Sequence, residues 1–167
     1  MRNGTGHTPD LAFQCLDILY LTRDKPVLRQ LFPYGKFQSP ADNERIAAVE
    51  SALRIRLPDQ LRALYLECDG FREDQGNTRY LLSLIDEESD SLKSLTEFCH
   101  SEFRETWPDL DLTPYVFFGS SAADELWGIR WTDGGEIIAF HHHMEGTYEV
   151  IGNDILEVYK ADYARYR

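Results

Sequence analysis

Three consecutive histidines, His141, His142 and His143, are the residues in the chain that most strongly suggest chemistry. Within a β-strand, His141 and His143 project to one face and lie close enough to share a metal ion. Carboxylates that could complete such a site belong to Asp124, Glu125 or Glu145. A zinc site generally needs three or four converging ligands and a second shell, and the sequence specifies neither. We therefore expect no metal and no cofactor, and a metal-dependent enzyme using His141 and His143 stays an alternative.

Other catalytic patterns are missing from the sequence. It contains no Gly-rich phosphate loop and no GxSxG, HExxH or DxDxDG motif. Its three cysteines, Cys15, Cys68 and Cys99, are widely spaced and fall in amphipathic helical patterns, which favours buried free thiols over a nucleophile or a disulfide framework. We expect a non-enzymatic protein of the reducing cytoplasm. No apolar run reaches the ~18 residues that a membrane span needs.

The negative charge is concentrated in one half of the chain. The 167 residues contain 29 acidic and 17 basic side chains, for a net charge of −12. Residues 86–157 hold 17 of the acids and only three bases, Lys93, Arg104 and Arg130, whereas residues 1–85 are neutral. Such a surface repels nucleic acid and anionic membranes and attracts a basic partner. A surface that only favours solubility is the alternative interpretation.

Acids at strand ends, in loops and at a helix start are the best candidates for contact with a partner. We expect no catalytic residues among them. The candidate partner-binding residues are Asp86, Glu87, Glu88, Asp90, Asp124, Glu125, Asp133 and Glu136.

Two tryptophans offer a second kind of contact. Trp127, Ile129 and Trp131 alternate with other residues and so share one face of a predicted strand. Burial against helices is the favoured interpretation, because large aromatic residues usually pack into cores. If that face were exposed, it would be an aromatic anchor for a partner.

The first half of the sequence has helical signals. A helix capped at Thr8 and one or two turns over residues 26–32 predict an N-terminal helical extension, residues 1–38. Ser39 followed by Pro40 predicts the start of the next helix. Pro58 interrupts that helix and opens another, which Gly70 ends.

The second half changes to strands. Residues 80–85 predict a strand, and a helix follows whose buried face comprises Leu92, Leu95, Phe98, Cys99 and Phe103. Strands are predicted over residues 115–118, 125–131, 136–140 and 147–151, with a hairpin turn at Asp133-Gly134 and a last helix after Asn153. This order predicts one α+β domain over residues 39–167, with helices packed on a central antiparallel sheet.

Two segments together resemble the SUKH superfamily, which includes a fungal cell-wall synthesis regulator and many bacterial immunity proteins. The first is IAAVESALRIRLP at residues 46–58, followed by QLRALY at residues 60–65 and Asp69-Gly70-Phe71. The second is YVFFG at residues 115–119, followed by ELWGI at residues 125–129, IIAFH at residues 137–141 and a helix. The resemblance implies an α+β fold without conserved catalytic machinery, and it implies that Leu57, Pro58, Gly70 and Gly119 are fold determinants.

The resemblance also implies a function, namely binding and neutralising a toxin encoded alongside, often a nuclease or deaminase. Nuclease toxins have basic clefts for phosphate, so carboxylates that enter such a cleft mimic the polyanion and block substrate. We therefore expect a cytoplasmic immunity protein for a basic toxin. A regulatory protein-interaction scaffold with no toxin partner is the alternative.

Overall fold

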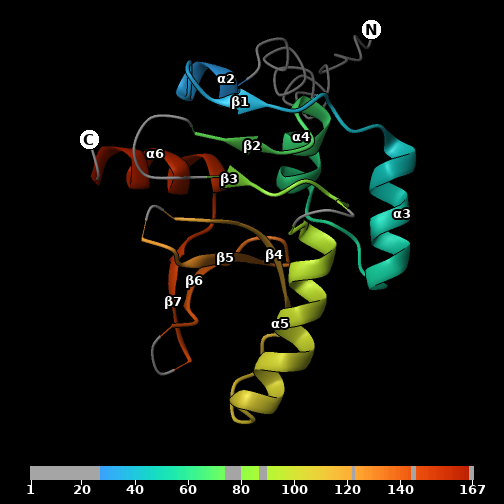
Figure 1. Ribbon diagram of the computed structural model, residues 1–167, viewed down its shortest axis with the longest axis vertical. Helices are drawn as coiled ribbons and strands as arrows, with labels where there is room; N and C mark the ends of the chain where they lie inside the picture. Colours follow the sequence, from blue (N-terminus) through green and yellow to red (C-terminus); the bar gives the residue numbers. More distant parts are fainter. Residues whose placement is uncertain (1–26, 74–79, 87–89, 122, 144–145, 166–167) are drawn as a thin grey trace, which may run out of the picture.

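The computed structural model describes residues 27–73, 80–86, 90–121, 123–143 and 146–165. Within these ranges, seven antiparallel strands form one sheet in chain order, with helices on both faces (Figure 1). The predicted α+β class is therefore confirmed. The strands are β1 (Lys36–Phe37), β2 (Phe71–Arg72), β3 (Tyr80–Leu81), β4 (Tyr115–Ser120), β5 (Leu126–Arg130), β6 (Ile137–His141) and β7 (Thr147–Gly152). The helices are α2 (Val27–Leu31), α3 (Asn43–Leu53), α4 (Asp59–Glu67), α5 (Leu92–Thr106) and α6 (Ile155–Arg165).

Strand alternation divides the core into two clusters, one on each face of the sheet. On one face, Trp127 and Ile129 of β5 are buried with residues of α2, α3, α4 and α6. On the other face, Phe117 and Phe140 pack with Cys99 of α5. Trp127 is only 2% exposed, which confirms burial and removes this residue as an exposed anchor.

The start of α3 differs from the prediction. Its N-cap is Asp42, whose Oδ1 accepts a hydrogen bond of 2.7 Å from Arg45 N, and not Ser39. Ser39 O instead accepts a hydrogen bond from Asp69 N, and Ala41 N donates to Tyr65 O, so this segment runs extended beside α4. These long-range backbone bonds take precedence over the local capping signal.

Gly70 has a different role from the predicted helix stop. Helix α4 ends at Glu67, three residues earlier, and Gly70 has φ +110°. A Cβ atom at this position would lie 3.1 Å from Ser83 N and 3.2 Å from Leu81 O. Glycine is therefore required here by the left-handed backbone and by the close approach of another segment.

Helix α5 begins with a capping box of Ser91 and Ser94. Its buried face includes Leu92 and Cys99, as predicted, but Phe98 is 46% exposed. Phe98 lies at the edge of the apolar stripe, where its ring packs edge-on against that of Phe103 with a centroid separation of 5.0 Å.

The predicted N-terminal extension lies in part outside the described residues, which begin at Val27. The part that is described, α2 and β1, packs into the same core as the rest of the domain through Leu28 and Phe32. Glu67 of α4 caps α2, accepting hydrogen bonds from Val27 N at 2.9 Å and Leu28 N at 2.8 Å.

Candidate functional site

The candidate acids do not form one cluster. Asp124 and Glu125 precede β5, whereas Asp133 and Glu136 lie in the turn that follows it, so the two pairs flank opposite ends of the strand. Asp124 and Asp133 are exposed, and Glu125 and Glu136 are half-buried. Glu87 and Glu88 lie outside the described residues.

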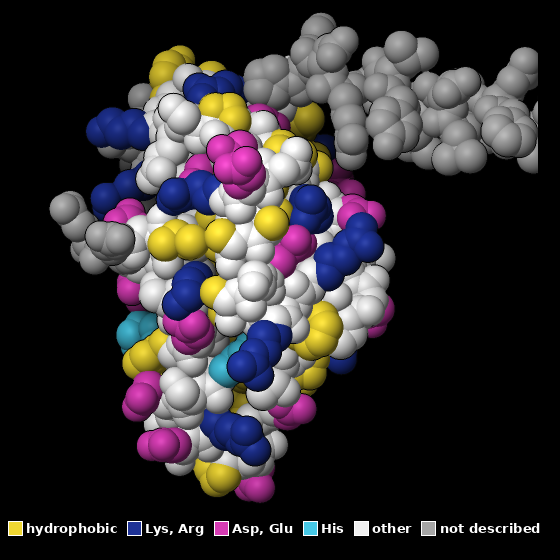
Figure 2. Space-filling view, turned by 90° about the vertical axis from the view of Figure 1, so that its right-hand side faces the viewer, with side chains coloured by type: hydrophobic (Ala, Val, Ile, Leu, Met, Phe, Trp, Pro, Cys, Tyr) yellow, Lys and Arg dark blue, Asp and Glu magenta, His cyan; other side chains and the backbone are white. Residues whose placement is uncertain are grey.

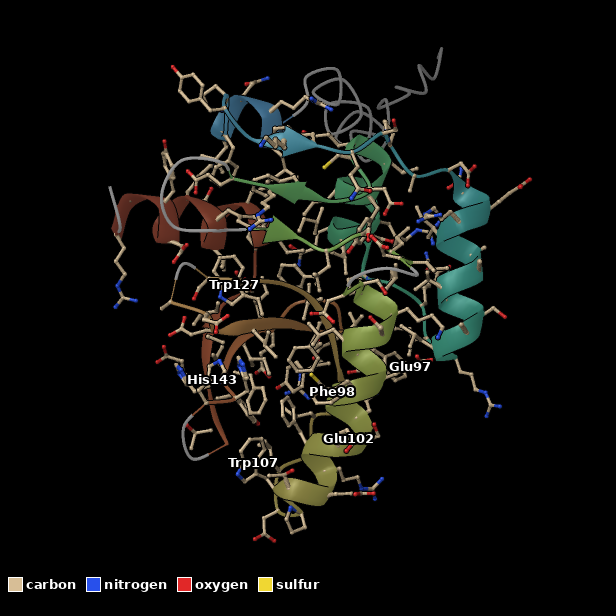
Figure 3. The ribbon with its side chains drawn as sticks, viewed as in Figure 1. Glu97, Phe98, Glu102, Trp107, Trp127 and His143 are labelled. Carbon is tan, nitrogen blue, oxygen red and sulfur yellow. The ribbon has the colours of Figure 1, made fainter. Side chains whose placement is uncertain are left out.

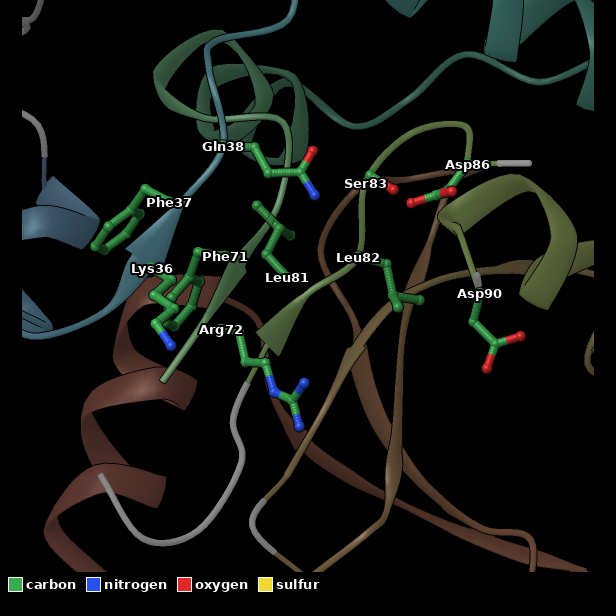
Figure 4. Close-up of a pocket in the computed structure, with 10 residues that line it drawn as sticks. All are labelled: Lys36, Phe37, Gln38, Phe71, Arg72, Leu81, Leu82, Ser83, Asp86 and Asp90. Atoms are coloured by element: carbon green, nitrogen blue, oxygen red, sulfur yellow. The ribbon is translucent and has the colours of Figure 1, made fainter. Parts of the chain in front are cut away.

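Asp86 and Asp90 line a cleft of about 560 Å³ beside the short strands β1, β2 and β3. Its apolar wall includes Phe71 and Leu81, and Figure 4 shows Lys36 and Arg72 at the end away from the two acids. The cleft therefore carries both signs of charge, and only one end of it suits a basic side chain.

Glu136 takes part in a hydrogen-bonded cluster on the sheet. Its Oε1 accepts hydrogen bonds from the Tyr115 hydroxyl and the Arg130 guanidinium, and Arg130 Nη2 lies 2.8 Å from the Tyr115 oxygen. These two donors hold the pKa of Glu136 below its ordinary value. Burial, followed by the hydrogen bond to Glu136, raises the pKa of Tyr115. This acid therefore has a structural role in the free protein.

The histidines are arranged differently from the prediction, because β6 ends at His141. His141 Nδ1 lies 3.5 Å from Glu125 Oε1. His143 is in the turn beyond the strand, and its Nε2 is hydrogen-bonded to Asp124 Oδ2 at 2.8 Å. The strand rule that placed His141 and His143 on one face does not extend into the turn, and the compact group is instead Asp124, His142 and His143.

His142 is half-buried against aromatic rings. Its ring centroid lies 6.2 Å from that of Phe103 and 6.4 Å from that of Phe140. Burial, and secondly the neighbouring His143, lowers the pKa of His142 below its ordinary value, so its imidazole is neutral at physiological pH. Among the described residues, its buried Nδ1 has no hydrogen-bond partner.

Sequence reasoning missed an exposed surface on α5. Glu97, Phe98 and Glu102 are all exposed on this helix, and Figure 3 labels them along α5. For Phe98 and Glu102 the signal was available, because residues at i and i+4 share a helix face. The apolar pattern predicts Phe98 on the buried face, and the structure corrects this.

The edge strand β7 presents further apolar surface. Tyr148 and Val150 are 39% and 58% exposed, and the Tyr148 ring packs against Tyr115 with a centroid separation of 5.8 Å. In contrast to this concentrated apolar surface, the side of the molecule that carries α3 and α5 displays acidic and basic side chains interspersed (Figure 2).

The sequence matches the model of one known protein family. The model of the SMI1/KNR4 family (SUKH-1) matches residues 40–159, from just before α3 into α6. No curated protein matches the chain. Within the described residues, none of the helices has the length and apolar character needed to cross a membrane. The family match spans most of the chain, and the protein therefore belongs to the SMI1/KNR4 family (SUKH-1).

Proposed function

We propose that this protein is a non-enzymatic immunity protein that binds and neutralises a cognate bacterial toxin of the basic, nuclease type. Its family supports an immunity or a regulatory role, and the members of that family are generally non-enzymatic. The toxin-neutralising role is the more specific of these possibilities, and it rests on the charge of the strand-rich half.

The observation that carries the proposal is the excess of acidic over basic side chains in residues 86–157. None of the described acids between residues 86 and 157 is buried. The bases of that segment are too few to neutralise them, and two of the three already pair with acids: Lys93 with Glu97 at 2.7 Å, and Arg130 with Glu136. The remaining negative field attracts a basic protein and speeds its association.

Binding also needs apolar contact, because exposed charges alone contribute little affinity. Phe98 supplies a large exposed aromatic ring between Glu97 and Glu102 on α5. An aromatic residue with a polar rim is the usual composition of an interface hot spot. We therefore place α5, together with the acids at the ends of β5, at the toxin-facing surface.

Inhibition would follow from occupancy of the toxin's phosphate-binding cleft. Carboxylates presented there occupy the positions of backbone phosphates, so substrate and inhibitor compete for the same basic side chains. This mechanism needs no catalytic group in the inhibitor.

Co-expression with the products of the neighbouring genes tests this function. Each flanking gene is expressed in a bacterial host with and without this protein, and growth and nucleic-acid integrity are measured. We expect one neighbour to arrest growth and this protein to restore it while forming a complex with the toxin. If no neighbour is toxic, or if a toxic neighbour is unaffected, the immunity role is lost and the regulatory scaffold is favoured.

Matched charge reversals test the electrostatic part. The variant E97K/E102K changes the α5 surface, and the control E44K/D59K makes the same change in charge on exposed residues of α3 and α4. With the toxin identified by co-expression, stopped-flow association should slow at least tenfold for the first variant and much less for the control, and the rate should fall with added salt. Equal rates for both variants would show that α5 does not face the toxin.

A further inference from the structure

Two turns meet at one end of the sheet, and each supplies metal-ligating side chains. The turn between β4 and β5 carries Asp124, and the turn after β6 carries His142 and His143. One ligand atom from each of the three residues lies within 4.8 Å of the other two. We propose that Asp124, His142 and His143 bind a divalent transition-metal ion, with Zn²⁺ as the best match.

The donor set supports zinc. Imidazole nitrogens and a carboxylate oxygen are ordinary zinc ligands, and they bind at about 2.0–2.2 Å. Ligand atoms around a tetrahedral ion then lie roughly 3.3 Å apart. The 2.8 Å between Asp124 Oδ2 and His143 Nε2 is near that spacing, and the His142 ligand atom lies within 4.8 Å of both, so the side chains must move to bind the ion. Water would complete the coordination.

The backbone around Asp124 is fixed in an uncommon conformation. Asp124 has φ +63°, a left-handed geometry that is uncommon for residues with a Cβ atom but that Asp adopts more readily than most. The surrounding loop maintains it, because Ser121 Oγ accepts hydrogen bonds from Ala123 N at 3.0 Å and Glu125 N at 3.2 Å. The carboxylate is thus presented from a defined loop.

The histidine turn is also held in place. The imidazole of His142 packs against Phe103 and Phe140, and its ring centroid lies 3.6 Å from that of His143. Gly146, with φ +63°, lies so close to Trp107 that a Cβ atom there would be 2.3 Å from the indole ring. Packing on α5 therefore positions the imidazole of His142 before any ion arrives, and the exposed His143 ring stacks on it.

His142 gives an independent reason to expect a ligand. Its buried Nδ1 lacks a hydrogen-bond partner within the described part of the chain, and an unsatisfied buried polar atom is unusual in a folded protein. His141, one residue away, is paired with Glu125 and is not in the three-residue group. His142 is therefore a proposed ligand and His141 is its control in the experiment below.

Isothermal titration of untagged, chelator-treated protein with ZnCl₂ tests this site, with MgCl₂ as a comparison. A tag-free protein is needed because a polyhistidine tag binds zinc itself. We expect one equivalent of zinc to bind, the melting temperature to rise on adding zinc, and no response to magnesium. The variants H143Q and D124N should weaken zinc binding by at least about tenfold, and H141Q should leave it unchanged.

Each other outcome overturns the proposal. Less than 0.1 equivalent of bound zinc would show that the group is only a surface hydrogen bond between Asp124 and His143. Loss of binding in H141Q with retention in H143Q would show a different ligand set. H142Q alters a packed side chain, so circular dichroism must show native structure before its zinc affinity is counted. Asp124 belongs both to this site and to the acids placed at the toxin-facing surface, but zinc binding is measured without a toxin, so either proposal can fail alone.

Discussion

At the scale of single residues, Asp69 is a buried acid with a structural role. It is 6% exposed, its Oδ1 accepts a hydrogen bond of 2.7 Å from Leu84 N, and its Oδ2 lies 2.5 Å from Arg45 Nε. The carboxylate thus joins the segment after α4 to α3 and to the strand-rich half. The resemblance to the family includes a polar residue before Gly70, and these contacts explain why a polar residue is needed there.

We expect D69A to lower the free energy of unfolding by about 2–3 kcal/mol, because it leaves the buried Leu84 N–H without an acceptor. Urea denaturation measures the change. D42A, which removes only the α3 cap, is the control and should cost about 1 kcal/mol. Equal effects of the two substitutions would contradict the special role of the buried carboxylate.

Glu136 gives a prediction about pH. Its pKa is lowered in the folded protein by the hydroxyl of Tyr115 and the guanidinium of Arg130. A carboxylate with a lowered pKa stabilises the fold above its unfolded pKa of about 4.3, and that stabilisation is lost as pH falls through the folded value. The difference in unfolding free energy between the wild type and E136Q should therefore be larger at pH 7 than at pH 3. E105Q, on the exposed surface of α5, is the control, and a difference for E136Q that did not change with pH would refute this reasoning.

At the scale of elements, α5 separates residues that stabilise the fold from residues available to a partner. Phe103 contacts the rings of Trp107 and Phe140, with centroid distances of 5.1 Å to each, whereas Phe98 is nearly half exposed. We expect F103A to cost roughly 3 kcal/mol and F98A roughly 1 kcal/mol. Chemical denaturation of both variants checks this. A larger cost for F98A would mean that its ring supports the core and is not an available anchor.

The sequence predicted elements well where the signal was local. Pro58 fixes its own φ and has no N–H, so it marked the start of α4 correctly. Helices repeat every 3.6 residues, which makes a fifteen-residue helix such as α5 visible in the pattern of apolar residues. The four longer strands were found because alternation needs several residues to be recognised.

The missed features depend on contacts between distant segments. Strands β1 and β2 have two residues each, and they exist because Lys36 and Phe37 pair with Arg72 and Phe71. No periodic pattern can show such a pairing. The candidate metal site could not be predicted from local periodicity either. Because β6 ends at His141, the compact group contains His142 and His143 in place of His141 and His143.

At the scale of the whole molecule, the core and the acidic residues are distributed differently along the chain. The larger core cluster contains residues from α2 through α6, and a second cluster lies on the other face of the sheet. The excess of acidic residues lies in residues 86–157, which supply α5 and strands β4 to β7. Stability therefore rests on the entire described chain, whereas the proposed recognition of a basic partner uses only its strand-rich half.

This continuity makes the boundary of the domain testable. The sequence predicted a domain beginning at residue 39, yet Leu28 is fully buried, Phe32 is 2% exposed, and Glu67 caps α2. Burying each of these two side chains contributes about 1.5–3 kcal/mol. A chain beginning at residue 39 should therefore be less stable than one beginning at residue 27 by roughly 3–6 kcal/mol in urea denaturation. Removing a segment that completes a core exposes apolar surface to water and lowers stability. Equal stability of the two chains would therefore show that α2 and β1 are not part of the domain core.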